Sequence, residues 1–328
     1  MKNIFNNIIQ VGMVTNDLVK SMENYYKKYK IGPFYVLEFN AENVQYMTVN
    51  GNKRNYSMKI GVSEIGTTRF ELIQPLDYSN YNEFYNKYGS DIIHHLKLST
   101  ENYYEVLNYL NNLGIKSLQS GNQSGIKGEN IYNYLSTSRH LGFIAEIFDV
   151  SKDFIKPDPD YWFPDQLTIG NKMFNKLSAI GMISEKLLEK IEIYQDLYGI
   201  GPWEIINFSN DNIKEMHIYE EKYDYKMEIA FCQLGDIQLK LIKPKSYSIY
   251  TEFLQKYGEE VIHHLRLAVE NFSYTIDYFK SIGIKVIQRG KYMGIIDFAY
   301  LDTASDLNFI IELVDNKNIK DCNTLNLP

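Results

Sequence analysis

The most constraining feature of this sequence is an internal repeat that relates its two halves. Residues 87–98 recur as residues 256–267, and each copy carries a His-His pair between a Lys-Tyr-Gly segment and a Leu-basic-Leu segment. His95 and His264, the second histidines of the two pairs, lie 169 residues apart (264 minus 95). The same offset holds for more than a hundred residues, whereas the repeats of solenoid proteins span about 20 to 50 residues. Each half of the chain is therefore predicted to be a domain.

The repeat also predicts where the domains begin and end. We expect a first domain over residues 1–150, a linker over 151–176 and a second domain over 177–328. A chain of 328 residues agrees with two domains of roughly 150 residues each. The linker contains three prolines around a Tyr-Trp-Phe segment, which is typical of an extended connection held against the surface by its aromatic side chains.

Within each copy the hydrophobic periodicity changes in the same order. The elements predicted for the first module are a strand over 10–14, a helix from Asn16 or Asp17 to about residue 31, and strands over 35–39, 57–62 and 69–74. A short helix over 81–88 then leads to the second module, which begins with a strand at His95, continues with a helix over 103–113 and ends with a strand over 143–148. Each half therefore reads as two βαβββ modules, and the whole chain as an α+β protein with four of them.

Composition excludes several classes of function. The net charge of −7 without a basic cluster argues against nucleic acid, because nucleic-acid affinity comes largely from basic side chains that neutralise phosphates. No apolar run reaches the ~18 residues that a membrane helix needs, and the N-terminus lacks a secretory pattern. Two cysteines provide no disulfide framework. We expect a cytoplasmic protein, monomeric or homodimeric, that acts on a small molecule.

The ordered motifs resemble those of the vicinal-oxygen-chelate superfamily (glyoxalase/bleomycin resistance/dioxygenase). They are a Gly-Pro-aromatic segment after the first helix, a Glu-Leu-Ile-Gln-Pro strand end at residues 71–75, the His-His-Leu strand, and a final strand with a glutamate. The chain looks most similar to the branch that contains glyoxalase I and methylmalonyl-CoA epimerase, over nearly its whole length. This resemblance implies two tandem domains with cupped mixed sheets.

The resemblance also implies a divalent metal site, to which each of four strands contributes one side chain. The positions of the first copy that match the metal ligands of the family are Gln10, Glu71, His95 and Glu146. Two carboxylates, an amide and an imidazole suit an octahedral ion such as Mg, Mn, Co, Ni, Fe or Zn. Without a thiolate, a closed structural zinc site is not expected.

The second copy keeps only half of this set. Its matching positions are Ala179, Lys240, His264 and Glu312. An ammonium at position 240 stands where a cation would lie, so we predict that Lys240 pairs with Glu312 without a metal.

Two pairings of the modules remain open. In this superfamily a site is completed within one domain or across two domains. The partners of Gln10 and Glu71 are therefore either His95 and Glu146 or His264 and Glu312.

Simpler structural roles compete with these interpretations. A buried histidine on a strand is more often a core residue than a metal ligand, and Glu71 could instead pair with Arg69 or Lys59. Because side chains alternate along a strand, His94 and His263 should point away from the site as structural or surface groups.

Three functions remain. The first is a metal-dependent isomerase, epimerase or lyase in which Glu146 or Glu312 moves a proton next to a metal-chelated carbonyl. The alternative is a non-catalytic protein that binds or sequesters a small molecule on the same scaffold. An extradiol-type dioxygenase ranks lower, because it needs two histidines and a carboxylate, and Gln10 and Ala179 stand where its first histidine is expected. A CoA ester, a hemithioacetal and a cyclic hydroxyketone all remain possible substrates.

Overall fold

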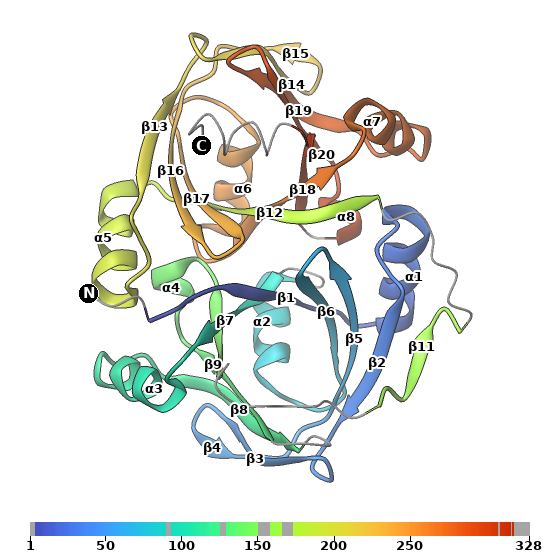
Figure 1. Ribbon diagram of the computed structural model, residues 1–328, viewed down its shortest axis with the longest axis vertical. Coiled ribbons are helices and arrows are strands. Elements are labelled where there is room, and N and C mark those ends of the chain that lie inside the picture. Colours follow the sequence, from blue (N-terminus) through green and yellow to red (C-terminus); the bar gives the residue numbers. More distant parts are fainter. Residues whose placement is uncertain are drawn as a thin grey trace. The chain divides into compact units, whose positions relative to one another are not determined.

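The computed structural model describes residues 4–89, 93–124, 129–149, 158–165, 173–307, 309–315 and 317. The chain divides into two compact units, Met1–Gly170 and Asn171–Pro328. Each unit is built around one strongly curved mixed sheet with helices outside it (Figure 1).

The first sheet joins the two modules of domain 1 side by side. Its strand order among the described residues is β11-β2-β5-β6-β1-β7-β10-β9-β8-β3-β4. The strands are β1 (Ile8–Val14), β2 (Phe34–Phe39), β3 (Val44–Val49), β4 (Asn52–Lys53), β5 (Met58–Ile65), β6 (Thr68–Pro75), β7 (Ile93–Thr100), β8 (Ser117–Ser124), β9 (Glu129–Leu135), β10 (Ile144–Asp149) and β11 (Tyr161–Phe163). The antiparallel pair β1 and β7 is the seam at which the first strands of the two modules meet.

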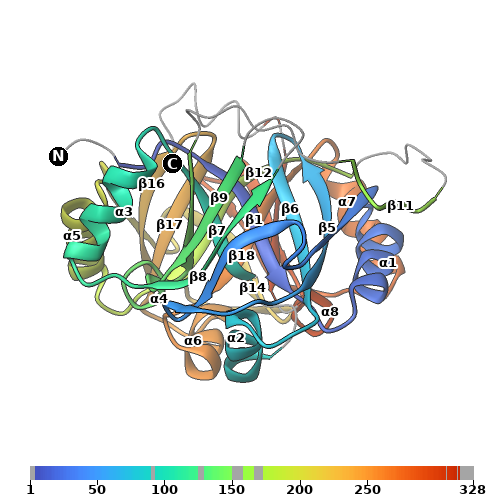
Figure 2. The ribbon, with the colours of Figure 1, turned by 90° about the horizontal axis from the view of Figure 1, so that it is seen from below.

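Four helices accompany this sheet: α1 (Leu18–Tyr29), α2 (Asn80–Tyr88), α3 (Tyr103–Asn112) and α4 (Ser138–Leu141). Helix α1 begins where the Asp17 side chain accepts a hydrogen bond from the Lys20 amide at 3.0 Å, which satisfies one of the free N–H groups of its first turn. Its buried residues Leu18, Met22, Tyr25 and Tyr29 recur at helical spacing along one face. Figure 2 shows α1 and α3 lying outside the curved sheet.

Packing on the convex face of the sheet shows which side chains of β6 point to the concave face. The ring of Tyr25 lies 5.2 Å from that of Phe70 on β6. Because side chains alternate along a strand, the next residue, Glu71, points to the concave face. The hydrophobic face of α1 thus helps to orient the carboxylate of the candidate site.

The hairpin formed by β3 and β4 is absent from the sequence-based prediction. It belongs to the first module, yet β3 pairs with β8 of the second. Strand β8 has the sequence Ser-Leu-Gln-Ser-Gly-Asn-Gln-Ser, which offers almost no apolar alternation. The hydrophobic pattern therefore gave no signal for this edge of the sheet.

Residues 158–165 of the predicted linker pack on domain 1, whereas residues 174–176, also predicted as linker, already belong to β12 (Phe174–Ile183) of domain 2. Strand β11 adds to the edge of the sheet by pairing with β2. The Trp162 ring lies 5.7 Å from that of Tyr35, and the Phe163 ring lies 6.3 Å from that of Tyr26. These aromatic contacts hold the segment against the first domain.

Domain 2 repeats the same arrangement. Its strand order among the described residues is β13-β16-β17-β12-β18-β21-β20-β19-β14-β15, which matches the first sheet strand for strand apart from β11. The strands are β12 (Phe174–Ile183), β13 (Glu204–Phe208), β14 (Ile213–Ile218), β15 (Glu221–Lys222), β16 (Met227–Leu234), β17 (Ile237–Pro244), β18 (Ile262–Val269), β19 (Val286–Tyr292), β20 (Ile296–Leu301) and β21 (Ile310–Asp315). The helices are α5 (Leu187–Tyr198), α6 (Ile249–Tyr257), α7 (Phe272–Ser281) and α8 (Ala304–Leu307).

The prediction of an α+β fold with two curved mixed sheets is confirmed. No described helix has both the length and the apolar character required to cross a membrane.

Candidate functional site

Four neighbouring strands of domain 1 each place one predicted side chain on the concave face. Gln10 lies on β1, Glu71 on β6, His95 on β7 and Glu146 on β10, and these strands are adjacent in the order β6-β1-β7-β10. All four residues are buried. Sequence positions that lie as far apart as residues 10 and 146 therefore meet at one point of the sheet.

The polar atoms of these side chains converge. Gln10 Nε2 donates to Glu71 Oε2 at 2.9 Å and lies 3.3 Å from His95 Nε2. His95 Nε2 lies 3.1 Å from Glu146 Oε2 and 3.7 Å from Glu71 Oε2. Of the two pairings left open by the sequence, the structure brings Gln10 and Glu71 together with His95 and Glu146.

Gly12 makes room for the His95 ring. It lies opposite both Glu71 on β6 and His95 on β7. A Cβ atom at this position would lie 1.9 Å from His95 Cε1, well inside van der Waals contact. The imidazole therefore lies flat against the β1 backbone, and only glycine is compatible with that position.

The neighbouring histidine, His94, contacts the His95 ring through its Nδ1 atom. His94 is fully buried rather than exposed, with its ring 5.0 Å from Tyr81 and 4.8 Å from Phe84. Its Nδ1 lies 3.1 Å from His95 Nδ1, and its Nε2 lies 3.2 Å from Asn80 Oδ1. Burial lowers the pKa of His94 well below its usual value, so this ring is neutral.

Two proton arrangements satisfy this row of rings. In the first, His95 Nδ1–H donates to His94 and His94 Nε2–H donates to Asn80 Oδ1, which leaves a lone pair on His95 Nε2 for a cation. In the second, His94 donates to His95, the Asn80 amide is turned, and His95 Nε2–H donates to Glu146. The same three side chains thus serve a site with or without an ion.

Lys97 is a fifth member of the site that the sequence-based prediction missed. Its Nζ lies 2.8 Å from Glu146 Oε1 and 4.9 Å from the centre of the Phe148 ring, and the residue is buried. The basic residue between two leucines is visible in both copies, and its position two residues after His95 places it on the same face of the strand. That alternation is the signal that could have identified it.

The two carboxylates of the site differ in their surroundings. Burial works to raise the pKa of Glu146, but Lys97 and His95 together lower it to about 2. The pKa of Glu71 is raised by burial, which outweighs the nearby His95. Among the described residues, the polar contacts of Glu71 are with Gln10 and His95 only, so neither Arg69 nor Lys59 forms an ion pair with it.

The donor set fits a divalent cation. As they stand, no three His, Cys, Asp or Glu side chains of the described residues are disposed to hold a metal ion. However, the site contains two buried carboxylates, Glu71 and Glu146, and one lysine. The separations of 3.1 and 3.7 Å between His95 Nε2 and the two carboxylate oxygens are close to the about 3 Å between adjacent ligands of an octahedral ion. Charge and donor chemistry therefore both favour a cation here.

The matching place in domain 2 already contains an ammonium. Lys240 Nζ lies 2.7 Å from Glu312 Oε2 and 3.1 Å from Oε1, and His264 Nε2 lies 3.1 Å from Glu312 Oε2. The predicted Lys240–Glu312 pair is confirmed. Despite the burial of Glu312, Lys240 and His264 hold its pKa well below the usual value. Ala179 contributes no polar group. His264 and Glu312 therefore have Lys240 and a methyl group beside them, where His95 and Glu146 have Glu71 and Gln10.

The steric arrangement around the second histidine pair is nevertheless unchanged. A Cβ at Gly181 would lie 1.9 Å from His264 Cε1, as at Gly12. His263 Nδ1 lies 2.8 Å from His264 Nδ1, and His263 is buried. The duplication has therefore kept the geometry of the histidines in both domains while changing their partners in one.

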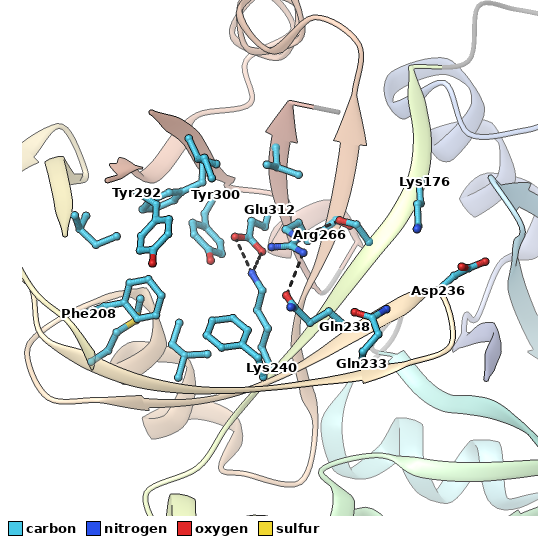
Figure 3. Close-up of a pocket in the computed structure, with 18 of the residues that line it drawn as sticks. Lys176, Phe208, Gln233, Asp236, Gln238, Lys240, Arg266, Tyr292, Tyr300 and Glu312 are labelled. Atoms are coloured by element: carbon cyan, nitrogen blue, oxygen red, sulfur yellow. Dashed lines mark hydrogen bonds and ion pairs between the residues drawn. The ribbon is translucent and has the colours of Figure 1, made fainter. Parts of the chain in front are cut away.

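The two concave faces enclose cavities of different size. The cavity beside Glu71 and Glu146 has a volume of about 70 Å³. The cavity beside Lys240 and Glu312 has a volume of about 380 Å³, and Figure 3 shows their ion pair at its centre. A typical small-molecule pocket spans about 300–1,000 Å³, so only the second cavity has that volume.

Comparison with known proteins agrees with the fold. Residues 179–300 match the family described as the glyoxalase/bleomycin resistance protein/dioxygenase superfamily. None of the curated proteins has a detectably similar sequence.

Three solved structures share this fold across the chain. A triple mutant of 4-hydroxymandelate synthase from Streptomyces coelicolor has a TM-score of 0.60 and 12% identity, over 95% of this chain and 92% of that one. The Mn(II)-bound glyoxalase from Novosphingobium aromaticivorans has a TM-score of 0.52 and 12% identity, over 95% and 83%. A xylose isomerase-like TIM barrel/4-hydroxyphenylpyruvate dioxygenase fusion protein has a TM-score of 0.55 and 10% identity, over 95% and 49%. Identities this low establish a common fold.

Substitution of Gly12 tests the steric role assigned to it. In Gly12→Ala the new methyl group must displace the His95 ring, which should lower the free energy of unfolding by about 1–3 kcal/mol. Gly181→Ala should cost a similar amount in domain 2. Urea unfolding followed by circular dichroism measures both, and wild-type stability in Gly12→Ala would show that the ring is free to move.

The Lys240–Glu312 pair predicts a pH-dependent contribution to stability. Because the pKa of Glu312 is lower in the native state than the about 4.3 of an unfolded glutamate, its contribution is complete above that value. It is lost as the pH falls towards the native pKa. Glu312→Gln should destabilise the protein by about 3–5 kcal/mol at pH 7, because Lys240 is left buried without a carboxylate.

Urea unfolding at pH 7 and at pH 3 measures this effect. The difference between wild type and Glu312→Gln should shrink at the lower pH. The double variant Lys240→Met/Glu312→Gln is the control and should cost less than the single variant, since it leaves no unpaired charge. A single variant as stable as wild type at pH 7 would contradict the assignment.

Proposed function

Because both domains carry the fold of the vicinal-oxygen-chelate superfamily, we propose that domain 1 is a metal-dependent isomerase, epimerase or lyase. It moves a proton next to a carbonyl group of a small molecule. The observation that carries this proposal is the convergence of Gln10, Glu71, His95 and Glu146, two of them buried carboxylates, on the concave face of domain 1.

The residues have separate roles in this proposal. Gln10, Glu71, His95 and Glu146 would hold the ion, and His94 would set the tautomer of the ligating imidazole through the contact between the two Nδ1 atoms. A divalent cation at this place supplies a Lewis acid that polarises a carbonyl oxygen and so acidifies the adjacent C–H bond. Lys97 keeps Glu146 anionic through its 2.8 Å contact.

Of the two carboxylates, Glu71 is the better candidate to move the proton. Lys97 and His95 stabilise the anionic form of Glu146, so this group accepts a proton less readily. Glu71 lies beside the amide of Gln10 and has no basic side chain within ion-pair distance among the described residues apart from His95. We therefore propose that Glu71 is the ligand that also moves the proton, whereas Glu146 serves ion binding alone, and Glu312 stays paired with Lys240 in the other domain.

The size of the first cavity restricts the substrate. A volume of about 70 Å³ admits only the few atoms around a reacting centre, so the rest of the molecule lies outside the concave face. This suits a compact carbonyl compound or the reactive end of a thioester. Dioxygenase chemistry fits less well, because that site needs two histidines and Gln10 occupies the position of one.

A second function, binding without chemistry, is favoured by one observation in domain 2. There the cavity is about five times larger (380 against 70 Å³), and the ion pair of Lys240 and Glu312 stands in place of a metal site. Glu312, the carboxylate at the centre of that cavity, is held by Lys240 and is therefore not free to accept a proton.

Titration calorimetry of metal-free protein with Mn²⁺, Co²⁺, Ni²⁺ and Zn²⁺ tests the ion site. Wild type should bind at least one of these ions, and Glu71→Gln should weaken that binding at least about tenfold, since it removes a charged ligand. Glu64→Gln, which changes an exposed glutamate near the end of neighbouring β5, is the matched control and should bind as wild type does. An affinity unchanged in Glu71→Gln, or no binding of any of the four ions, would refute the site.

Hydrogen exchange tests the reaction independently. Metal-loaded wild type should exchange the proton next to the carbonyl of a CoA ester, a hemithioacetal or a cyclic hydroxyketone with deuterium from solvent. Proton NMR follows the exchange. Glu71→Asp should retain the ion but slow the exchange by at least tenfold, because the shorter side chain moves the carboxylate away from the carbon. Exchange as fast as in wild type would exclude Glu71 as the base.

A further inference from the structure

The cavity of domain 2 has an apolar end and a polar end. Figure 3 shows Phe208, Tyr292 and Tyr300 gathered at one side of it, while Arg266, Gln238 and Gln233 lie at the other. The ring centres of Phe208 and Tyr292 are 5.3 Å apart, and those of Phe208 and Phe231 are 6.1 Å apart. Such walls favour a flat apolar group.

Arg266 contributes a positive charge that is not held in an ion pair by any carboxylate of the described residues. Its Nε donates to Ser178 Oγ at 3.0 Å, and one of its terminal nitrogens donates to Gln238 Oε1 at 3.2 Å. Both partners are neutral, and no carboxylate of the described residues lies within ion-pair distance of the guanidinium. The side chain is half-buried and lines the cavity.

Comparison of the two domains explains why this arginine is available. Arg266 occupies the position of Lys97, which in domain 1 is paired with Glu146 at 2.8 Å. In domain 2 the equivalent carboxylate, Glu312, is held by Lys240 instead. Lys240 stands at the position of Glu71 and so occupies the place of the candidate ion. Because Lys240 also pairs with Glu312, Arg266 on β18 forms no ion pair with that carboxylate.

The same exchange changes the shape of the cavity. Ala179 stands where Gln10 fills the first site, and the wall position of Val62 becomes Phe231. The charged groups at the centre are Lys240, Glu312 and Arg266, with a net charge of +1. A singly charged anion balances this charge.

We propose that the cavity of domain 2 binds a small organic acid without a metal ion. The carboxylate of the ligand pairs with the guanidinium of Arg266, which presents a planar fork of donors suited to a carboxylate. Its flat apolar body packs against Phe208, Phe231 and Tyr292. The volume of about 380 Å³ accommodates a molecule of one or two rings.

Calorimetric titration in the presence of EDTA tests this proposal and keeps it separate from the ion site of domain 1. The probes are benzoate, cinnamate and naphthalene-2-carboxylate, with cinnamamide and hexanoate as their neutral and non-aromatic counterparts. At least one aromatic acid should bind with a dissociation constant below 1 mM, at least tenfold tighter than cinnamamide and hexanoate. If none of the three acids binds below 1 mM, or if binding requires added Mn²⁺ or Zn²⁺, the proposal is wrong.

Substitution of the arginine locates the binding. Arg266→Met should weaken the aromatic acid at least tenfold, and Arg266→Lys should restore part of the loss. Arg289→Met, an exposed arginine on β19 of the same domain, removes the same charge away from the cavity and should leave binding unchanged. Circular dichroism checks that each variant is folded. The assignment would be overturned if a folded Arg266→Met or Arg266→Lys variant bound the acid as tightly as wild type does. It would also be overturned if Arg289→Met lost as much affinity as Arg266→Met.

Discussion

Each domain buries a carboxylate at the centre of its sheet, on β10 in domain 1 and on β21 in domain 2, and the polar groups around it are arranged to neutralise its charge. Glu146 and Glu312 lie on apolar strands, and both residues are buried. An unpaired charge at such a place is costly, so each domain must supply a cation. Domain 2 supplies the ammonium of Lys240 within the same sheet. In domain 1, Lys97 lies 2.8 Å from one oxygen of Glu146, and His95 Nε2 lies 3.1 Å from the other.

This difference separates what the duplication kept from what it changed. Both copies keep a glycine beneath an imidazole ring, with a second histidine behind that ring. These contacts are steric and belong to the fold. The polar groups around the imidazole differ between the copies. They are the amide of Gln10 and the carboxylate of Glu71 in domain 1, whereas domain 2 has the methyl group of Ala179 and the ammonium of Lys240. In our two proposals, one scaffold therefore presents an ion site in domain 1 and an organic-anion site in domain 2.

Much of this was predictable from the sequence, because an internal repeat supplies its own comparison. Most of the strands, the four candidate side chains of domain 1 and the Lys240–Glu312 pair follow from the repeat and its resemblance to a known superfamily. Lys97 was missed although alternation from His95 places it on the same face. The β3–β4 hairpin was missed because it pairs with a polar strand. Cavity volume depends on packing between distant strands and leaves no local pattern.

The most direct measurement is the number of ions bound per chain when the ligands missing from domain 2 are restored. Our account predicts that wild type binds one Mn²⁺, Co²⁺, Ni²⁺ or Zn²⁺ in calorimetric titration. The variant Ala179→Gln/Lys240→Glu should bind two, because it places an amide and a second carboxylate beside His264 and Glu312. Two ions in wild type, or one ion that is lost when Lys240 alone is changed, would contradict the claim that the ion belongs to domain 1.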